Sequence, residues 1–288
     1  MSRVGLYYRN YQLSEQKHLA QFSILRAAFR KHGIDLVECL NVFETDKIIE
    51  SYNPDFVLFY DKDMFRARLF EKRGIVVFNN SLSLEVCDDK ALAYMTVENV
   101  PGIKLIPSVV NPYPFADSDE FRRDCLLLSL SQFDYPYILK ATKGSLGQQV
   151  FMVCSEQEYM ERMKDLGLQQ TITQSFVKSS YGRDLRVWVV GHRIIKTVIR
   201  QSRDDAEFRS SISLGGHYGD SYKLDKFEKN IVKGISTALR MDFGTIDFLF
   251  GDNNTLLFCE ANTNAVFSNL DLSIGENIAE YVIRKIYG

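Results

Sequence analysis

The sequence predicts an α/β protein of three parts, a small open parallel α/β lobe at the N-terminus followed by two α+β lobes. Short apolar runs alternate with helical periodicity through the first 85 residues, which favours parallel strands joined by crossover helices. Further along, two pairs of strand-like segments flank short polar turns that contain glycine, a pattern typical of antiparallel hairpins. The predicted domains are residues 1–85, 86–176 and 177–288.

The N-terminal lobe is predicted from one clear helix and four strands. Residues 14–32 carry Leu19, Phe22, Leu25 and Phe29 at helical spacing, and Gly33 follows as a helix-ending glycine. The strands are expected at residues 4–8, 36–40, 55–60 and 74–78. The turn after the first strand has none of the glycines that a dinucleotide pyrophosphate requires, so a Rossmann site is excluded there.

The two following lobes are predicted from mixed strands and helices. The second lobe begins with a helix at 88–97, a Pro-rich loop at 107–119 and a helix near 120–132. Its strands are expected at 137–140, 150–154 and 171–175, with a helix at 156–166. In the third lobe, hairpin strands are expected at 184–190 and 193–200 and again at 243–250 and 255–260. A mobile loop at 201–222 and helices at 224–240 and 274–286 complete the prediction.

Composition excludes several classes of function. The chain has 288 residues, a net charge of −2 and a pI of about 6.1, so nothing in it favours a polyanion such as nucleic acid. Five dispersed cysteines without C-x-x-C spacing indicate a reduced intracellular protein rather than a disulfide scaffold or a zinc site. No run approaches the ~20 apolar residues of a membrane span, which predicts a cytoplasmic protein without membrane contact.

A loop with two glycines follows a lysine at the end of a predicted strand. Lys140 is succeeded by Gly144, Ser145 and Gly147. Backbone amides in such a loop can point at phosphate oxygens, and the lysine adds a positive charge. An ordinary hairpin with a solvated lysine explains the same residues equally well. The loop is not a Walker A sequence, because no Lys-Ser/Thr pair opens a helix after the glycines.

Three oxygen-bearing side chains lie on the last predicted hairpin. Glu260 and Asn262 face the same way because side chains alternate along a strand, and a hairpin centred near Asn253 brings Asp247 opposite Cys259 or Glu260. Two carboxylates and an amide oxygen are hard ligands suited to Mg²⁺. The alternative is that Asp247 pairs with a nearby basic residue. The cost of burying an unpartnered carboxylate in an apolar strand favours the metal interpretation.

Basic residues are frequent in the strands and loop before this hairpin. Arginine offers a planar fork for phosphates and carboxylates. We expect Arg186, Arg200 and Arg209 to neighbour the metal hairpin. The other arginines of this stretch, Arg183, Arg193 and Arg203, are expected to be solvated.

Taken in order, these features resemble the ATP-grasp superfamily and, within it, the RimK-like ligases, which include ribosomal-protein and cofactor glutamate ligases. The resemblance runs from about residue 79 to the C-terminus. Its anchors are Asp89-Lys90, Tyr137 to Lys140 with the glycine loop, Gln174 to Val177, Gly182 to Arg186, Phe208 to Ser210, Gly215-Gly216, Asp247, and Glu260 to Asn262. The ordered set at family-like spacing is more specific than any one motif.

The resemblance implies a role for each matching residue. Phosphates of ATP would be held by Lys90, Lys140 and the loop with Gly144, Ser145 and Gly147. Adenine would meet Ser175 and Phe176, the ribose would meet Asp184, and Arg209, Ser210 and Ser211 would reach the nucleotide from the large loop. Mg²⁺ (or Mn²⁺) would be bound by Asp247, Glu260 and Asn262. Arg186 and Arg200 would be catalytic, stabilising an acyl phosphate.

The implied activity is ATP-dependent joining of a carboxylate to an amine, such as that of glutamate, through an acyl phosphate with release of ADP and phosphate. The implied partners are small-molecule substrates, and relatives suggest a homodimer. The N-terminal lobe would serve as scaffold and acceptor-side wall. Two alternatives remain open at this point: a peptide-tailoring enzyme that forms ester or amide crosslinks, and a non-catalytic ATP-binding regulatory module. The sequence departs from the family pattern at Gln149, Ser175, Ser211 and Thr263 to Ala265, which affects the acceptor substrate most.

Overall fold

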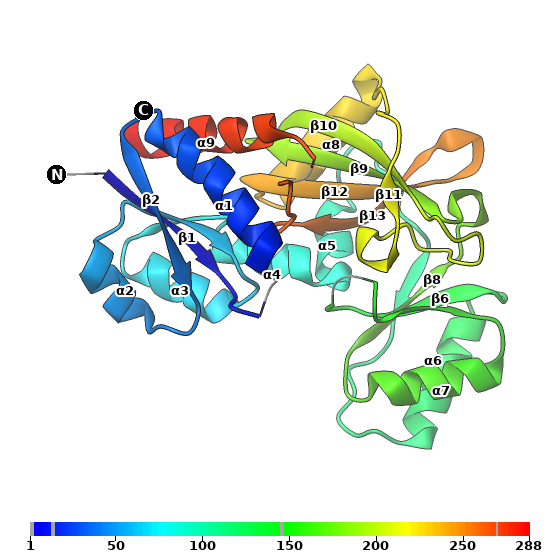
Figure 1. Ribbon diagram of the computed structural model, residues 1–288. Coiled ribbons are helices and arrows are strands. Elements are labelled where there is room, and N and C mark those ends of the chain that lie inside the picture. Colours follow the sequence, from blue (N-terminus) through cyan, green and yellow to red (C-terminus); the bar gives the residue numbers. More distant parts are fainter. Residues whose placement is uncertain (1–2, 13–14, 145–146, 269) are drawn as a thin grey trace.

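The computed structural model describes residues 3–12, 15–144, 147–268 and 270–288, and the strands of these residues form three sheets. Figure 1 shows the N-terminal sheet and the large C-terminal sheet side by side, with the small sheet hanging below the large one. The mixed α/β architecture is the one predicted. No helix of the described residues is long and apolar enough to cross a membrane.

The N-terminal sheet is parallel, in the order β2-β1-β3-β4. Its strands are β1 (Arg3–Arg9), β2 (Ile34–Leu40), β3 (Phe56–Tyr60) and β4 (Val76–Phe78). Tyr7 points to the face covered by α1 (Glu15–Arg30) and the C-terminal helix α9 (Leu272–Tyr287), which run side by side. The neighbouring Leu6 and Tyr8 point to the face covered by α2 (Thr45–Tyr52), α3 (Met64–Lys72) and α4 (Ser81–Asp88). Burial on both faces explains why these strands are continuously apolar.

The small sheet is antiparallel, in the order β5-β8-β6-β7. Its strands are β5 (Ser108–Val110), β6 (Tyr137–Ala141), β7 (Val150–Val153) and β8 (Thr171–Ser175). Two helices, α6 (Asp119–Leu130) and α7 (Glu156–Leu166), cover one face through a core that includes Tyr137, Leu139 and Tyr159. The segment predicted as a loop at 107–119 contains β5, which adds a short edge strand.

The large sheet is antiparallel, in the order β11-β10-β9-β12-β13. Its strands are β9 (Arg183–Val190), β10 (Arg193–Gln201), β11 (His217–Tyr218), β12 (Phe243–Phe250) and β13 (Leu256–Asn262). One face packs on α5 (Lys90–Val97) and α8 (Lys226–Ala238), and Trp188 and Phe243 on the other face pack against α9. The segment predicted as a mobile loop contains β11, which pairs with the end of β10.

The helix predicted at 88–97 corresponds to α5, which begins at Lys90, while Asp88 ends the preceding helix α4. The backbone of Asp89 is extended, and its carboxylate accepts hydrogen bonds from the amides of Ala91 and Leu92, so α4 ends and α5 begins there. A side-chain cap of this kind satisfies backbone donors that the first turn of a helix leaves unpaired. Although α5 falls in the predicted second domain, it packs in the core of the large sheet. The domain boundaries themselves stay predictions.

Asn79 joins the N-terminal lobe to the large sheet. Its side chain is fully buried, and its Nδ2 donates to the carbonyl oxygen of Phe243 at 2.8 Å. Its Oδ1 accepts from the amides of Asp242 and Phe243 at 2.7 and 3.2 Å. Buried amides that satisfy donors and acceptors in this way fix one relative placement of the elements they join.

Candidate functional site

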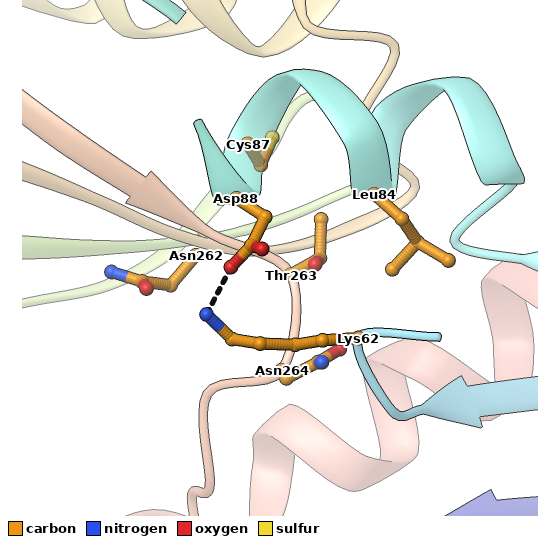
Figure 2. Close-up of a pocket in the computed structure, with 7 residues that line it drawn as sticks. All are labelled: Lys62, Leu84, Cys87, Asp88, Asn262, Thr263 and Asn264. Atoms are coloured by element: carbon orange, nitrogen blue, oxygen red, sulfur yellow. Dashed lines mark hydrogen bonds and ion pairs between the residues drawn. The ribbon is translucent and has the colours of Figure 1, made fainter. Parts of the chain in front are cut away.

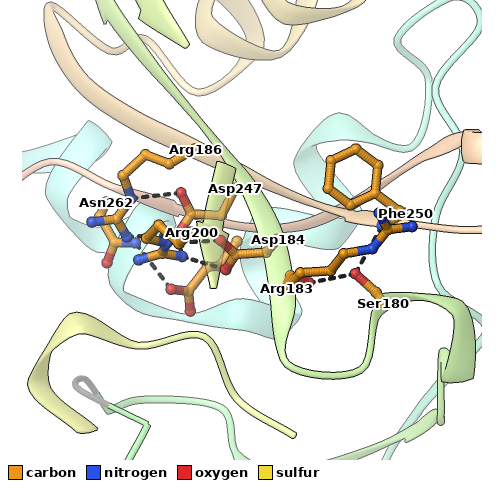
Figure 3. A network of polar contacts seen from close by, with 9 residues as sticks. Ser180, Arg183, Asp184, Arg186, Arg200, Asp247, Phe250 and Asn262 are labelled. Atoms are coloured by element: carbon orange, nitrogen blue, oxygen red, sulfur yellow. Dashed lines mark hydrogen bonds and ion pairs between the residues drawn. The ribbon is translucent and has the colours of Figure 1, made fainter. Parts of the chain in front are cut away.

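Three side chains predicted to belong to the site are brought together by strand register. Arg186 on β9 lies opposite Asp247 on β12, which in turn lies opposite Glu260 on β13. Asn262 is two residues beyond Glu260 and therefore faces the same way. Of the two partners predicted for Asp247 from the hairpin, Cys259 and Glu260, the structure has Glu260. Figure 3 shows Arg186, Arg200, Asp184, Asp247 and Asn262 gathered on this face of the sheet.

The carboxylate of Asp247 is fully buried and is held by two arginines. Arg186 donates from Nε to Oδ1 at 2.9 Å and from Nη2 to Oδ2 at 2.6 Å, and Arg200 donates from Nη2 to Oδ2 at 2.8 Å. Burial opposes ionisation of Asp247, but the charges of Arg186 and Arg200 outweigh it and hold its pKa below the ordinary value. Asp247 therefore pairs with basic residues, which was the alternative considered from the sequence.

Arg200 also binds Asp184. Its Nε donates to Asp184 Oδ1 at 2.8 Å, and its Nη2 contacts Oδ2. Burial raises the pKa of Asp184, against the attraction of Arg200. Both carboxylate oxygens of Asp184 are thus engaged by the arginine. The ribose role of Asp184 stays a prediction, and the structure gives this carboxylate a different partner.

Glu260 and Asn262 form the open side of the predicted metal site. Asn262 Nδ2 donates to Glu260 Oε1 at 3.1 Å, and no ion pair of Glu260 is found in the described part of the chain. In that same part, no three His, Cys, Asp or Glu side chains gather around one point. The donor set is therefore two carboxylates and one amide, and these hard oxygens fit a magnesium ion that keeps water and phosphate ligands. The metal role of the three residues stays a prediction.

Lys140 is a buried cation beside these oxygens. Its side chain is 4% exposed, and within the described ranges its ammonium makes no hydrogen bond or ion pair. Burial is the main cause that lowers its pKa; the charge of Lys90 adds to this, while Cys259 and Glu260 oppose it. Removing an ammonium from water is costly. An anion bound at this point would offset that cost.

Lys90 attaches the first turn of α5 to the glycine loop. Its Nζ donates to the carbonyl oxygen of Gly144 at 3.3 Å, and its backbone amide donates to the carbonyl of Thr142 at 2.8 Å. Asp89 accepts from the Thr142 hydroxyl at 3.3 Å. The structure therefore brings the two predicted phosphate lysines to the same loop. Ser145, predicted to belong to the phosphate site, lies outside the described residues.

Arg209 joins the loop predicted at 201–222 to the glycine loop, which contains Gly144 and Gly147. Its Nη1 donates to the carbonyl oxygen of Gly147 at 2.6 Å, while its Nε and Nη2 donate to the carboxylate of Glu207 at 2.8 and 2.7 Å. The guanidinium thus bridges two loops from different lobes. Ser210, which follows it, is buried. The nucleotide contacts predicted for Arg209, Ser210 and Ser211 stay predictions.

An aromatic cluster lies where the two lobes are linked. Phe176 packs edge-on against Tyr181 and Phe208, with ring centroids 6.1 and 6.3 Å apart. The amide of Ser175 donates to the carbonyl of Pro107 at 3.0 Å. Flat aromatic surface of this kind suits a base, and the adenine role of Ser175 and Phe176 stays a prediction.

The family follows from comparison with known proteins. Residues 122–286, more than half of the chain, match the model of the RimK-like ATP-grasp domain. The chain belongs to the RimK-like ATP-grasp family. The predicted enzyme class, an ATP-grasp ligase, agrees with relatives and structural neighbours that are named synthases and ligases.

Relatives of this RimK-like chain cover it to different extents. The uncharacterized protein MG012 homolog of Mycoplasma pneumoniae is 29% identical over 273 residues, 93% of each chain. N-acetylaspartylglutamate synthase A of Homo sapiens is 29% identical over 229 residues, which are 77% of this chain and 56% of the human one. D-alanine–D-alanine ligase from Bacillus anthracis shares the fold, with a TM-score of 0.76 at 14% identity over 99% of this chain and 97% of that one.

This RimK-like protein contains a pocket that the sequence did not predict. It is lined by Lys62, Leu84, Cys87, Asp88, Asn262, Thr263 and Asn264 (Figure 2). These residues come from the end of β3, from α4 and from the segment after β13, so local patterns do not connect them. Asp88 was assigned to a continuous helix, and the capping aspartate beside it was the signal that could have revealed the break.

One arginine expected to be solvated is packed instead. The guanidinium of Arg183 lies 4.7 Å from the centroid of the Phe250 ring (Figure 3). Its Nη2 also donates to the carbonyl of Ser179 at 3.3 Å. The planar guanidinium stacks on aromatic faces, which gives Arg183 a structural role at the end of the large sheet.

Proposed function

We propose that this protein joins a carboxylate to an amine at the expense of ATP, through an acyl phosphate, with release of ADP and phosphate. The observation that carries the proposal is the buried side chain of Lys140 close to Glu260, with which its charge interacts. A cation next to hard oxygen ligands, at the start of a glycine loop, is what a triphosphate with its metal would complete. Membership of an ATP-grasp ligase family supports the same assignment.

The proposed reaction has two steps. A carboxylate oxygen attacks the γ-phosphorus, the bond from that phosphorus to the bridging oxygen breaks, and ADP leaves with the electron pair. The nitrogen of a neutral amine then attacks the acyl carbon, phosphate departs, and the nitrogen loses a proton. The first step brings two anions together and the second expels an anion, so positioning and charge neutralisation account for most of the catalysis.

Different residues of the site are proposed to position the substrates and to neutralise their charge. Lys140 and Lys90 bind phosphate oxygens, and Arg209 holds the glycine loop in place through Gly147. Arg186 is 13% exposed at its side chain, compared with 8% for Arg200, so it is the less buried of the two arginines. Arg186 and Arg200 provide fixed positive charge where the acyl phosphate develops negative charge.

Mg²⁺ is proposed to be held by Glu260 and Asn262 together with Asp247. When bound, the ion would neutralise charge on the phosphates. Glu260 is available for this role because it forms no ion pair among the described residues, whereas Asp247 shares its carboxylate with two arginines. The amine is proposed to be that of an amino acid, in line with the human relatives named N-acetylaspartylglutamate synthase A and beta-citrylglutamate synthase B.

A product assay tests the proposal. The purified chain is incubated with ATP, Mg²⁺ and pairs drawn from a panel of amino acids and carboxylates, and the nucleotide products are separated. We expect ADP and phosphate only when both substrates of a productive pair are present. AMP and pyrophosphate would overturn the acyl-phosphate route. Tight Mg²⁺–ATP binding without turnover over the whole panel would instead identify a nucleotide-binding module.

A further inference from the structure

Residues 263–268, which we call the exit segment, leave the end of β13 directly after the proposed metal ligand Asn262. The exit segment contains neither proline nor glycine, so none of its residues has the fixed φ angle that proline would supply. Its conformation therefore depends on contacts with other parts of the chain. Because the backbone is continuous, those contacts also bear on where the Asn262 side chain lies.

The N-terminal lobe makes hydrogen bonds along the exit segment. Asn264 Nδ2 donates to the carbonyl oxygen of Asp61 at 2.8 Å, and the amide of Phe267 donates to Gln21 Oε1 at 3.0 Å. The hydroxyl of Ser268 donates to a backbone carbonyl of α1 at 3.2 Å. Two of these three acceptors are backbone carbonyls, so Gln21 is the acceptor that a substitution can remove.

The amide of Gln21 has one orientation, which its two partners define. Gln21 is fully buried. The backbone amide of Phe267 can only donate, so Oε1 faces it, and Nε2 donates to the Tyr7 hydroxyl at 3.0 Å. That hydroxyl contacts Nδ1 of His18 at 2.9 Å. Burial lowers the pKa of His18 to about 4, so the imidazole is neutral and Nδ1 accepts the Tyr7 proton.

Phe267 packs on the face of the large sheet that carries the proposed site. Its ring lies edge-on to Trp188, with centroids 6.1 Å apart. Trp188 is two residues from Arg186 on β9, so both side chains point to this face. Phe267 is itself buried, which withdraws its backbone amide from water, and such an amide needs an acceptor from the protein. Gln21 supplies that acceptor.

We propose that Gln21 is a positioning residue of the ligase reaction: it fixes the exit segment, and through that segment the metal ligand Asn262. The inference rests on the proposed function and adds to it a residue of the N-terminal lobe. Groups that hold metal ligands in place affect metal affinity strongly without touching the ion. Tyr7 and His18 act one step further away, because they hold the Gln21 amide in its orientation.

The dependence of ATP affinity on Mg²⁺ tests this proposal. The Kd of ATP for the full chain is measured by calorimetry without and with Mg²⁺, and the ratio of the two constants reports metal binding. Gln21→Leu removes the acceptor and should reduce this ratio about tenfold, with the Kd in the absence of Mg²⁺ unchanged. Tyr7→Phe is the milder variant, since it releases only the orientation of Gln21, and should reduce the ratio about threefold.

Two further variants separate positioning from stability. Gln21→Glu keeps an oxygen for the Phe267 amide but buries a carboxyl group, so the Tm should fall while the ratio stays within about twofold of wild type. Ser236→Ala removes a hydrogen bond of 2.8 Å to His192, and α8, which carries Ser236, packs on the opposite face of the large sheet. It should lower the Tm by about 2–4 °C, without changing the ratio.

Amide hydrogen exchange at Phe267 locates the effect. Exchange there should be at least about tenfold faster in Gln21→Leu and unchanged in Ser236→Ala. Four results would each overturn the proposal: wild-type exchange at Phe267 in Gln21→Leu, an unchanged ratio in that variant, an equal loss in Gln21→Glu, or an equal loss in Ser236→Ala. A wild-type chain whose ATP affinity does not depend on Mg²⁺ would instead count against the proposed function itself.

Discussion

Arg186 lies opposite Asp247 across the β9–β12 pair and donates two hydrogen bonds to its carboxylate. Arg200 donates a third. Asp247 therefore has a structural task apart from any metal it binds, because it neutralises two guanidinium groups that are themselves mostly buried. Glu260, opposite it on the other side, has no such task. This difference allows stability and metal binding to be separated by mutation.

Asp247→Asn is expected to lower the free energy of unfolding by about 3–5 kcal/mol, because breaking a buried ion pair leaves uncompensated charge. Urea unfolding measures the change. Asp35→Asn is the control: Asp35 is 60% exposed and lies 3.6 Å from Arg26, so its loss should change stability by less than about 0.5 kcal/mol. Equal effects of the two substitutions would contradict the structural role of Asp247.

Glu260→Gln should impair Mg²⁺ binding and leave the stability of the fold nearly unchanged. Since no ion pair of Glu260 is found in the described ranges, its neutralisation should change stability by less than about 0.5 kcal/mol. Affinity for ATP should lose its dependence on Mg²⁺, because a hard carboxylate ligand is replaced by a neutral amide. Calorimetric titration of ATP with and without Mg²⁺ checks this. A variant with wild-type Mg²⁺ dependence would exclude Glu260 as a ligand.

Lys140→Met is expected to raise stability and to abolish nucleotide binding. The Lys140 side chain is buried and burial lowers its pKa, so its replacement by an apolar side chain should stabilise the ligand-free protein by about 1 kcal/mol. Phosphate contact is lost at the same time. Thermal unfolding with and without Mg²⁺–ATP measures both effects. Lys164→Met on the exposed face of α7 serves as control and should change neither; a destabilised Lys140→Met would contradict the interpretation.

Asp242→Asn should make stability less sensitive to pH. Burial raises the pKa of Asp242 to about 6, against a hydrogen bond of 2.7 Å from the Tyr281 hydroxyl. Because the folded pKa exceeds the unfolded value of about 3.9, the carboxyl stabilises the fold at low pH and loses that contribution as pH rises through 6. The asparagine variant should therefore exceed wild type by about 2–3 kcal/mol at pH 8 and converge with it near pH 4.

Unfolding at both pH values checks this prediction. Exposed Asp252 offers the control substitution Asp252→Asn, which should track wild type at both. A constant difference between Asp242→Asn and wild type at pH 4 and pH 8 would show that Asp242 does not titrate with folding.

Local pattern was enough to predict the hairpin register to within one residue. Alternation along 243–250 and 255–260 and the polar turn between them placed Asp247 opposite Cys259 or Glu260, and the structure has Glu260. The turn contains Asn253 and Asn254 with positive φ, a conformation that asparagine tolerates better than most residues. The alternation of both strands and the residues of the turn favour the same hairpin, and such local agreement makes a register predictable.

Non-local pairing was beyond the same reasoning. Which strand neighbours β12 depends on the order of the whole sheet, so the burial of Asp247 between Arg186 and Arg200 could be raised only as an alternative. Helices α2, α3 and α4 were missed because they are short or lack a wide apolar stripe; their burial comes from packing on the N-terminal sheet. The pocket lining was missed because it combines three distant segments.

The break between α4 and α5 places three successive side chains in three directions. Asp88 lines the pocket with Lys62, Asp89 caps α5, and Lys90 reaches the glycine loop. A group bound in the pocket would contact Asp88, and a phosphate bound at the glycine loop would contact Lys90, only two residues further along the chain. Inserting one residue after Asp88 would keep every side chain but would change the orientation of Asp88 at the pocket relative to Lys90 at the glycine loop.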